Sequence, residues 1–103
     1  MQVLKDPDYR TLKELAHELA DDMIHMKLYW ANVAQGNKRL KITSKLILRW
    51  LEIKGYTLSW VWLGQFVKLL AEWLEEYGYK MTEKRLGAGR NNSTTVYIFE
   101  RVV

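Results

Sequence analysis

Apolar and polar positions follow a helical period over the first third of the chain. From residue 10 to residue 34, apolar side chains recur every three or four positions, while charged side chains occupy the opposite side. The apolar stripe comprises Leu12, Leu15, Ala16, Leu19, Met23, Met26, Trp30, Val33 and Ala34. Pro7 stands where a helix can begin but cannot continue, so we expect residues 1–9 to form a short arm. The pattern therefore predicts one long helix over residues 10–34.

Two further helical patterns lie on either side of a break that contains a glycine. Residues 44–54 and residues 58–77 each carry one apolar stripe, and Lys54-Gly55-Tyr56-Thr57 separates them. The stripes comprise Leu46, Ile47, Trp50 and Leu51 before the break, and Leu63, Phe66, Val67, Leu70, Trp73, Leu74 and Tyr77 after it. Two helices that meet across a turn of about three or four residues form a helix-turn-helix.

The period changes from helical to extended after Gly78. Two extended segments flank the polar, glycine-rich stretch of residues 87–93, so residues 79–102 are expected to form a two-stranded β-hairpin. The predicted fold class is α+β, with three helices followed by this hairpin. A chain of 103 residues is long enough for one domain and its core, and too short for two.

The composition removes several classes of function. The chain contains no cysteine, which excludes disulfides, thiolate metal sites and cysteine nucleophiles. It has no apolar run of roughly twenty residues and no apolar signal-peptide region at its start. No Ser/His/Asp arrangement, phosphate-cradling loop or pair of catalytic carboxylates can be assembled. We therefore expect a cytoplasmic protein without a membrane partner, an enzymatic activity or a cofactor.

The net charge of +4 is distributed unevenly along the chain. Residues 36–56 hold six basic side chains and one acidic one, and the hairpin carries a further basic surplus. Basic clusters of this kind attract polyanions, although Lys and Arg also serve simply to keep a surface soluble. The charge pattern alone leaves both interpretations open.

Three helices followed by a hairpin with a Gly/Arg/Asn tip resemble the winged helix-turn-helix superfamily over roughly residues 10–102. Small single-domain proteins of this layout look similar to regulators from archaea and their viruses. In that superfamily the helix after the turn enters the major groove, the wing follows the adjacent backbone or minor groove, and the helix before the turn contacts phosphates. The resemblance implies a partner, double-stranded DNA, and a role as a transcriptional regulator or as a chromatin- or nucleoid-associated factor.

The resemblance also assigns contacts by position. Ser59, Gln65 and Lys68 would contact base edges or the groove, and Gln can pair with adenine through two hydrogen bonds. Lys45 and Arg49 would contact the backbone, and Arg90 would be the wing-tip contact. With the other basic residues of these segments, the candidate DNA-binding set is Lys38, Arg39, Lys41, Lys45, Arg49, Ser59, Gln65, Lys68, Lys84, Arg85 and Arg90.

Three features have more than one interpretation. His17, Asp21 and His25 share one helix face at metal-ligand spacing, but the same residues make an ordinary solvated face, and we expect no metal. Trp60 and Trp62 fit a partial core, a protein interface or a platform for unpaired bases. A winged helix that binds another protein through this aromatic surface is therefore the alternative function.

The length of the first predicted helix suggests an oligomer. A helix of about 25 residues extends well beyond the shorter helix predicted after it, so part of its apolar stripe needs another partner. We expect a homodimer with an interface formed by Met23, Met26, Trp30 and Val33.

Overall fold

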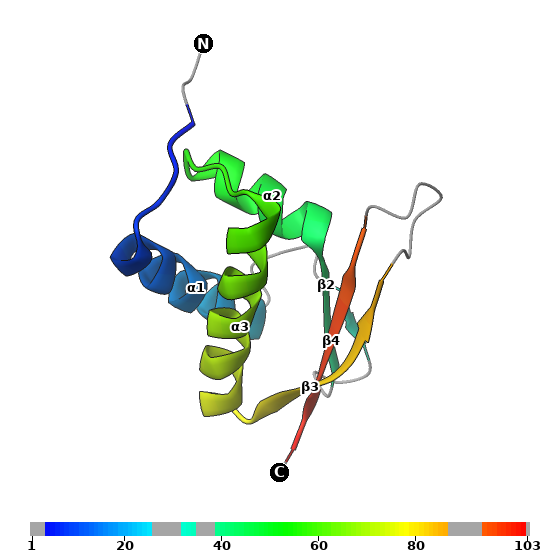
Figure 1. Cartoon of the computed structure of the whole chain (residues 1–103). Coiled ribbons are helices and arrows are strands. Elements are labelled where there is room, and N and C mark those ends of the chain that lie inside the picture. The colour runs from blue at the N-terminus through cyan, green and yellow to red at the C-terminus, as the bar shows by residue number, and fades with distance from the viewer. Residues whose placement is uncertain (1–3, 26–31, 35–38, 87–93, 103) are drawn as a thin grey trace.

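The computed structural model describes residues 4–25, 32–34, 39–86 and 94–102, and for residues 32–34 it describes the backbone. Its elements, in chain order, are α1 (Tyr9–Ile24), β1 (Asn32–Ala34), β2 (Arg39–Thr43), α2 (Ser44–Ile53), α3 (Trp60–Glu76), β3 (Tyr79–Arg85) and β4 (Val96–Arg101). The three helices lie on one side of an antiparallel sheet (Figure 1). The predicted α+β class and the three helices are confirmed.

The sheet contains more strands than the sequence pattern predicted. The strand order is β1-β2-β4-β3, in which β2, β4 and β3 are five to seven residues long and β1 adds three residues at the edge. β3 and β4 pair as the expected hairpin, but the prediction of only two strands was wrong. β2 pairs with β4 in the register Leu40↔Phe99 and Ile42↔Tyr97, and all four of these side chains enter the core.

The prediction of one helix over residues 10–34 was also wrong. α1 ends at Ile24, and residues 32–34 pair with β2 in the register Asn32↔Lys41. Their backbone groups bond to a neighbouring strand, which excludes the bonds within the segment that a helix requires. With sixteen residues, α1 matches the seventeen of α3, against which it packs. The excess helical length expected from the sequence is therefore absent from the described residues.

The two later helices begin and end close to their predicted limits, and polar side chains cap them. The Thr43 hydroxyl accepts a hydrogen bond from the Leu46 amide at 3.2 Å, and Ser59 accepts from the Trp62 amide at 3.5 Å. Gly55 and Gly78, which follow these helices, adopt φ angles of 95° and 89°, a conformation that favours glycine. Figure 1 shows α2 running across the end of α3 where α3 begins.

The N-terminal arm pairs with the turn between α2 and α3. The Lys5 amide donates to the Gly55 carbonyl at 3.1 Å, and the Thr57 amide donates to the Lys5 carbonyl at 2.9 Å. These bonds form a parallel β-bridge between Lys5 and Tyr56. Lys5 thus holds the turn between α2 and α3 in place.

Candidate nucleic-acid interface

The outer face of α2 carries two exposed cations. Ser44, Ile47, Trp50 and Leu51 turn inward, so the helical period places Lys45 and Arg49 on the opposite side. Neither cation forms an ion pair or a hydrogen bond within the described part of the chain. By contrast, Lys54 at the end of the helix pairs with Glu18 of α1.

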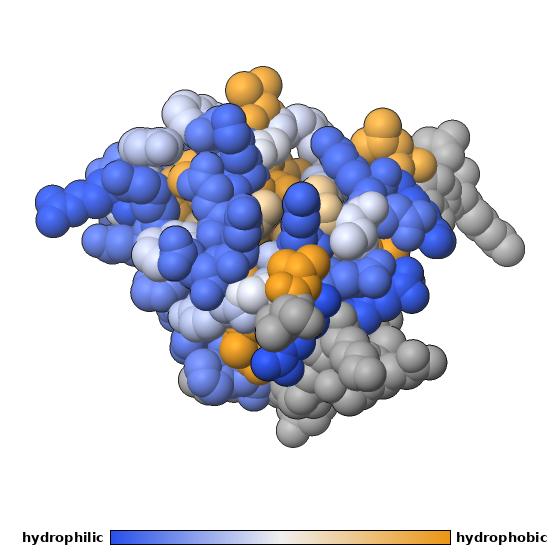
Figure 2. All heavy atoms as spheres, turned by 90° about the horizontal axis from the view of Figure 1, so that it is seen from below, coloured by the Kyte–Doolittle hydropathy of each residue, from blue (hydrophilic) through white to orange (hydrophobic). Residues whose placement is uncertain are grey.

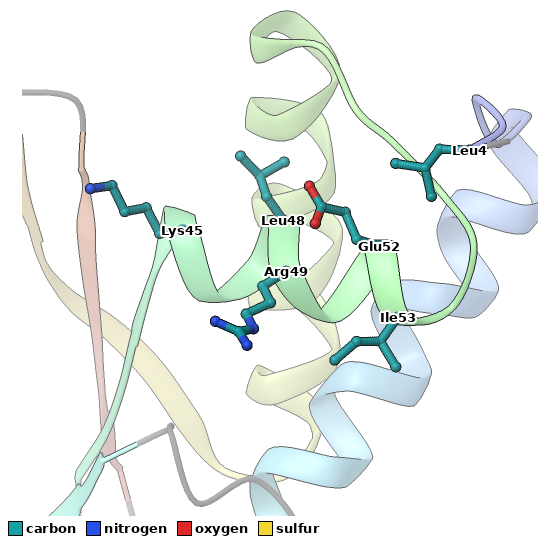
Figure 3. Close-up of a pocket in the computed structure, with 6 residues that line it drawn as sticks. All are labelled: Leu4, Lys45, Leu48, Arg49, Glu52 and Ile53. Carbon is teal, nitrogen blue, oxygen red and sulfur yellow. The ribbon is translucent and has the colours of Figure 1, made fainter. Parts of the chain in front are cut away.

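A groove follows this face of α2. It is lined by Leu4, Lys45, Leu48, Arg49, Glu52 and Ile53. In Figure 3, Lys45 extends from the first turn of α2 and Arg49 from the next, away from the carboxylate of Glu52. Both positive charges therefore remain available for an external anion.

The first turn of α3 exposes three consecutive apolar side chains. Trp60 is 65% exposed, Val61 83% and Trp62 49%, and none of them belongs to the hydrophobic core cluster. The structure thus does not place Trp60 and Trp62 in the core, which was one of the three interpretations of these residues. Their neighbour Ser59 caps the helix and is also exposed.

The charge of α3 changes along its exposed face. Gln65 is half-buried and Lys68 is exposed, whereas Glu72, Glu75 and Glu76 are exposed near the other end. Figure 2 shows the molecule from below, on the side where α3 ends. This face is mostly hydrophilic, with small separate apolar areas. Only the first half of α3 is free of acidic side chains that would repel phosphate.

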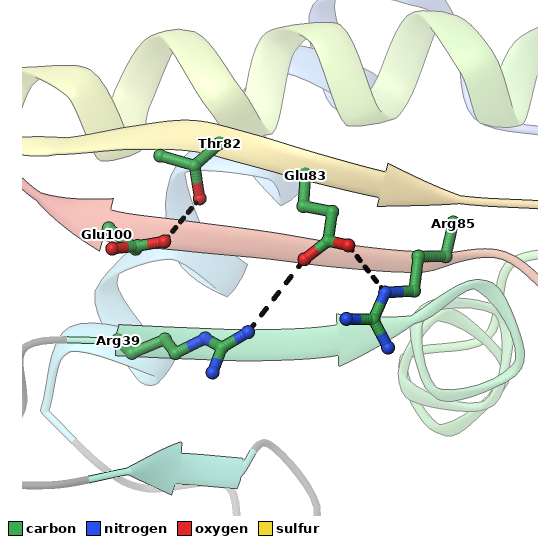
Figure 4. A network of polar contacts seen from close by, with 5 residues as sticks. All are labelled: Arg39, Thr82, Glu83, Arg85 and Glu100. Atoms are coloured by element: carbon green, nitrogen blue, oxygen red, sulfur yellow. Dashed lines mark hydrogen bonds and ion pairs between the residues drawn. The ribbon is translucent and has the colours of Figure 1, made fainter.

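Two of the predicted basic contacts are neutralised on the sheet. Glu83 lies between them, 2.6 Å from the Nε of Arg85 and 3.9 Å from Arg39 (Figure 4). The hydrogen bond from Arg85 lowers the pKa of the Glu83 carboxyl and raises the pKa of the Arg85 guanidinium. Arg39 and Arg85 are therefore less available to an external anion than Lys45 and Arg49.

A β-bulge brings Glu83 into this network. The register of β3 against β4 shifts between Met81 and Glu83, so that Glu83 pairs with Ile98 and Lys84 with Tyr97. Without the extra residue in β3, Glu83 would pair with Tyr97. Its side chain would then lie on the same face of the sheet as the side chain of Tyr97, towards the core. The bulge turns Glu83 to the face away from the helices, and Lys84 to the face towards them.

The start of α2 and the basic end of the hairpin lie close together. The Ser44 amide donates to the Thr95 carbonyl at 2.8 Å, and the Thr95 amide donates to the Ser44 hydroxyl at 3.0 Å. Thr95 precedes Val96, which pairs with Arg85. Lys45, Lys84 and Arg85 are therefore grouped at one end of the sheet, and the exposed Lys84 has no acidic partner among the described residues.

Of the other predicted contact residues, one is half-buried and others lie outside the described residues. Lys41 is half-buried and shares the outer face of β2 with Arg39. Lys38 and Arg90 lie outside the described residues, as do Met26 and Trp30 of the predicted dimer interface. Val33 is described only by its backbone in β1. Met23 has no exposed surface and belongs to the core of a single chain, so it is not available to a second copy.

The three candidate metal ligands on α1 make other contacts. His17 stacks on Trp73, with ring centroids 3.9 Å apart and ring planes 15° from parallel. The Nδ1 of His25 lies 3.2 Å from the Asp21 carboxylate and 2.8 Å from the Asp21 carbonyl oxygen. Within the described ranges, no three His, Asp or Glu side chains are grouped so that they could hold a metal ion.

Comparison of the chain with protein-family models, curated protein sequences and solved structures finds no match. None of the described helices combines the length and the apolar character that crossing a membrane requires. Function must therefore be argued from the surface itself.

Proposed function

We propose that this chain is a winged helix-turn-helix domain that binds double-stranded DNA. The observation that carries the proposal is the pair of free cations, Lys45 and Arg49, on the outer face of the helix before the turn. Lys45 lies at the same end of the sheet as Lys84 of the hairpin. In this proposal the hairpin is the wing. The order of helix, turn, helix and hairpin is the one in which winged helices present these elements to a duplex.

The charges define how the duplex would lie. Lys45, Arg49, Lys68 and Lys84 bind phosphates and supply affinity without reading sequence. The first half of α3 enters the major groove, because the exposed glutamates of its second half would repel the backbone. Gln65 supplies the amide that can pair with an adenine edge. Sequence recognition in this arrangement depends on few residues, all near the start of α3.

The salt dependence of binding to a random duplex tests the proposal. If Lys45, Arg49, Lys68 and Lys84 each neutralise one phosphate, the slope of log K against log salt is near −4, and about six contacts would bring it near −5. The double variant Lys45→Ala/Arg49→Ala should bind more weakly and make the slope shallower by about 2. A matched control is Lys80→Ala/Arg101→Ala, which removes the same charge from the far end of the hairpin. Absence of binding at low salt, or equal losses in the two double variants, would contradict the proposal.

The exposed indoles of Trp60 and Trp62 favour a second candidate, a module that binds another protein. In that case the cations of α2 would be incidental. The same titration separates the two functions, because a protein-binding module has no steep dependence of DNA binding on salt.

A further inference from the structure

The apolar first turn of α3 has a specific consequence if this helix enters DNA. Hydrogen-bonding groups are few there, because the Ser59 hydroxyl is already engaged as the acceptor of the Trp62 amide, Gln65 is half-buried, and each indole offers one N–H donor and no acceptor. The first cation of the helix is Lys68. The most exposed side chain is Val61, which can neither donate nor accept a hydrogen bond.

One group in the major groove matches such a surface. Among the four base pairs, the edges carry hydrogen-bond donors and acceptors, and thymine adds an apolar C5-methyl group. Contact between a valine side chain and a methyl group removes apolar surface of both groups from water. Where a valine faces a cytosine or guanine edge instead, it leaves polar groups without a partner.

The helical period places Val61 at the centre of the outward face. Residues two apart differ by about 200° around a helix axis, so Trp60 and Trp62 lie on opposite flanks of Val61. They do not form one continuous platform on which successive unpaired bases could stack. A Cβ built at Gly64, one turn further along, would have no atom within 4 Å apart from those of its chain neighbours and of its own helix backbone. The surface beside Val61 is therefore low and open, which allows a groove floor to approach it closely.

We propose that the first turn of α3 recognises thymine C5-methyl groups in the major groove, with Val61 as the central contact and Trp60 and Trp62 beside it. The ligand is then a duplex with A·T pairs at the positions that α3 faces. This inference rests on the proposed DNA binding. The free cations Lys45 and Arg49 favour a phosphate-bearing partner over an apolar peptide for the same surface.

Replacing thymine by uracil isolates the methyl group, because the two bases pair identically. The probe is a duplex of about two helical turns of alternating A·T pairs, prepared with thymine or with uracil. At fixed salt, loss of each contacted methyl should weaken binding by about fourfold. Val61→Ala should bind the thymine duplex more weakly and should lose most of the distinction between the two probes. The control Val102→Ala removes the same kind of side chain, 54% exposed and beside the other end of α3, and should keep the full distinction.

Each outcome decides a definite point. Equal affinity for the two duplexes, with steep salt dependence retained, overturns methyl recognition and leaves DNA binding intact. Tighter binding to a duplex with unpaired thymines than to the fully paired one also overturns it, in favour of base stacking. A Val61→Ala variant that still distinguishes the probes in full removes Val61 from the contact. Failure to bind any duplex at low salt contradicts the proposed function and, with it, this inference.

Discussion

Ser44 and Thr95 hold each other through two reciprocal hydrogen bonds, although 51 positions separate them in the sequence. Ser44 is the first residue of α2 and is fully buried, and Thr95 directly precedes β4. The pair fixes where the helix before the turn begins relative to the hairpin. Any duplex that contacts both elements therefore meets them at a fixed separation.

The substitution Ser44→Ala should destabilise the fold by about 1 to 3 kcal/mol, because it leaves the part-buried Thr95 amide without its acceptor. Chemical denaturation measures the change. The control is Thr57→Ala. At this exposed position the backbone amide, and not the side chain, makes the hydrogen bond to Lys5, so stability should change by less than about 0.5 kcal/mol. Equal stabilities for the Ser44 variant and the wild type would show that the reciprocal bonds do not fix the helix start.

Gln65 and Lys68 should have different effects on DNA binding, because one can pair with a base edge and the other meets phosphate. Gln65→Ala should reduce discrimination between a selected site and random DNA by about 1 to 3 kcal/mol. Lys68→Ala should weaken binding to both DNAs to a similar degree. Binding titrations on both DNAs measure this, and parallel losses in the two variants would argue that Gln65 does not read sequence.

Removal of the Glu83 carboxylate should strengthen DNA binding. Glu83→Gln frees Arg39 and Arg85 from their shared acidic partner, and an additional phosphate contact from Arg85, at the end of the sheet that also holds Lys45, should steepen the salt slope by about 1. The control Glu75→Gln removes a carboxylate at the acidic end of α3 that forms no ion pair with any residue the structure describes. If the two variants gain affinity equally, the gain comes from net charge and not from the released arginines.

Stability should fall on acidification, partly through Asp8 and Glu83. The Thr11 amide donates to Asp8 at 2.7 Å and lowers the pKa of that carboxyl, and Arg85 lowers the pKa of Glu83. A lowered pKa in the folded state means that the stabilisation is complete above the unfolded values, about 3.9 for Asp and 4.3 for Glu. It is lost as the pH falls below them through the folded values.

Thermal melts between about pH 6 and pH 3 measure this loss. Asp8→Asn keeps a good helix cap but removes its titration, so the variant should lose less stability on acidification than the wild type. An acid profile unchanged in both Asp8→Asn and Glu83→Gln would assign the acid sensitivity to other carboxylates.

The homodimer stays a prediction, although the described residues do not show the excess helix length that motivated it. If Met26 and Trp30 form an interface, Met26→Glu should convert a dimer to a single chain and weaken binding to paired half-sites. Met23→Glu is not a usable test, because a charge at this buried position would unfold the chain. Sedimentation equilibrium at micromolar concentration decides the matter, and a wild-type species near 12.3 kDa would contradict the dimer.

The sequence predicted the local elements better than the pairing between them. The stripes of α2 and α3 depend on side chains only three or four positions apart, so the periodicity located both helices to within one or two residues at each end. One partner of β2, the strand β4, lies more than fifty positions further along the chain, and no local pattern indicates this pairing. A signal was nevertheless present, because Arg39 to Thr43 alternates polar and apolar residues with the period of a strand.

Part of the candidate site could also be predicted from the sequence, because that part depends on local helical periodicity. The outward positions of Lys45 and Arg49 follow from the stripe of α2. The pairing of Glu83 with two arginines depends on a bulge and on the order of strands, neither of which is a local property. The exposure of Trp60 and Trp62 could not be read from the stripe either, because indoles at its edges can face inward or outward.

The bridge between Lys5 and Tyr56 limits how far α2 and α3 can be treated as a separable module. The turn between α2 and α3 takes two of its backbone hydrogen bonds from a residue near the start of the chain. A graft of residues 44–76 into another scaffold would leave the Gly55 carbonyl and the Thr57 amide without these partners. A bulky fusion placed directly before Leu4 would crowd the same turn, so an affinity tag on this protein belongs at the other terminus.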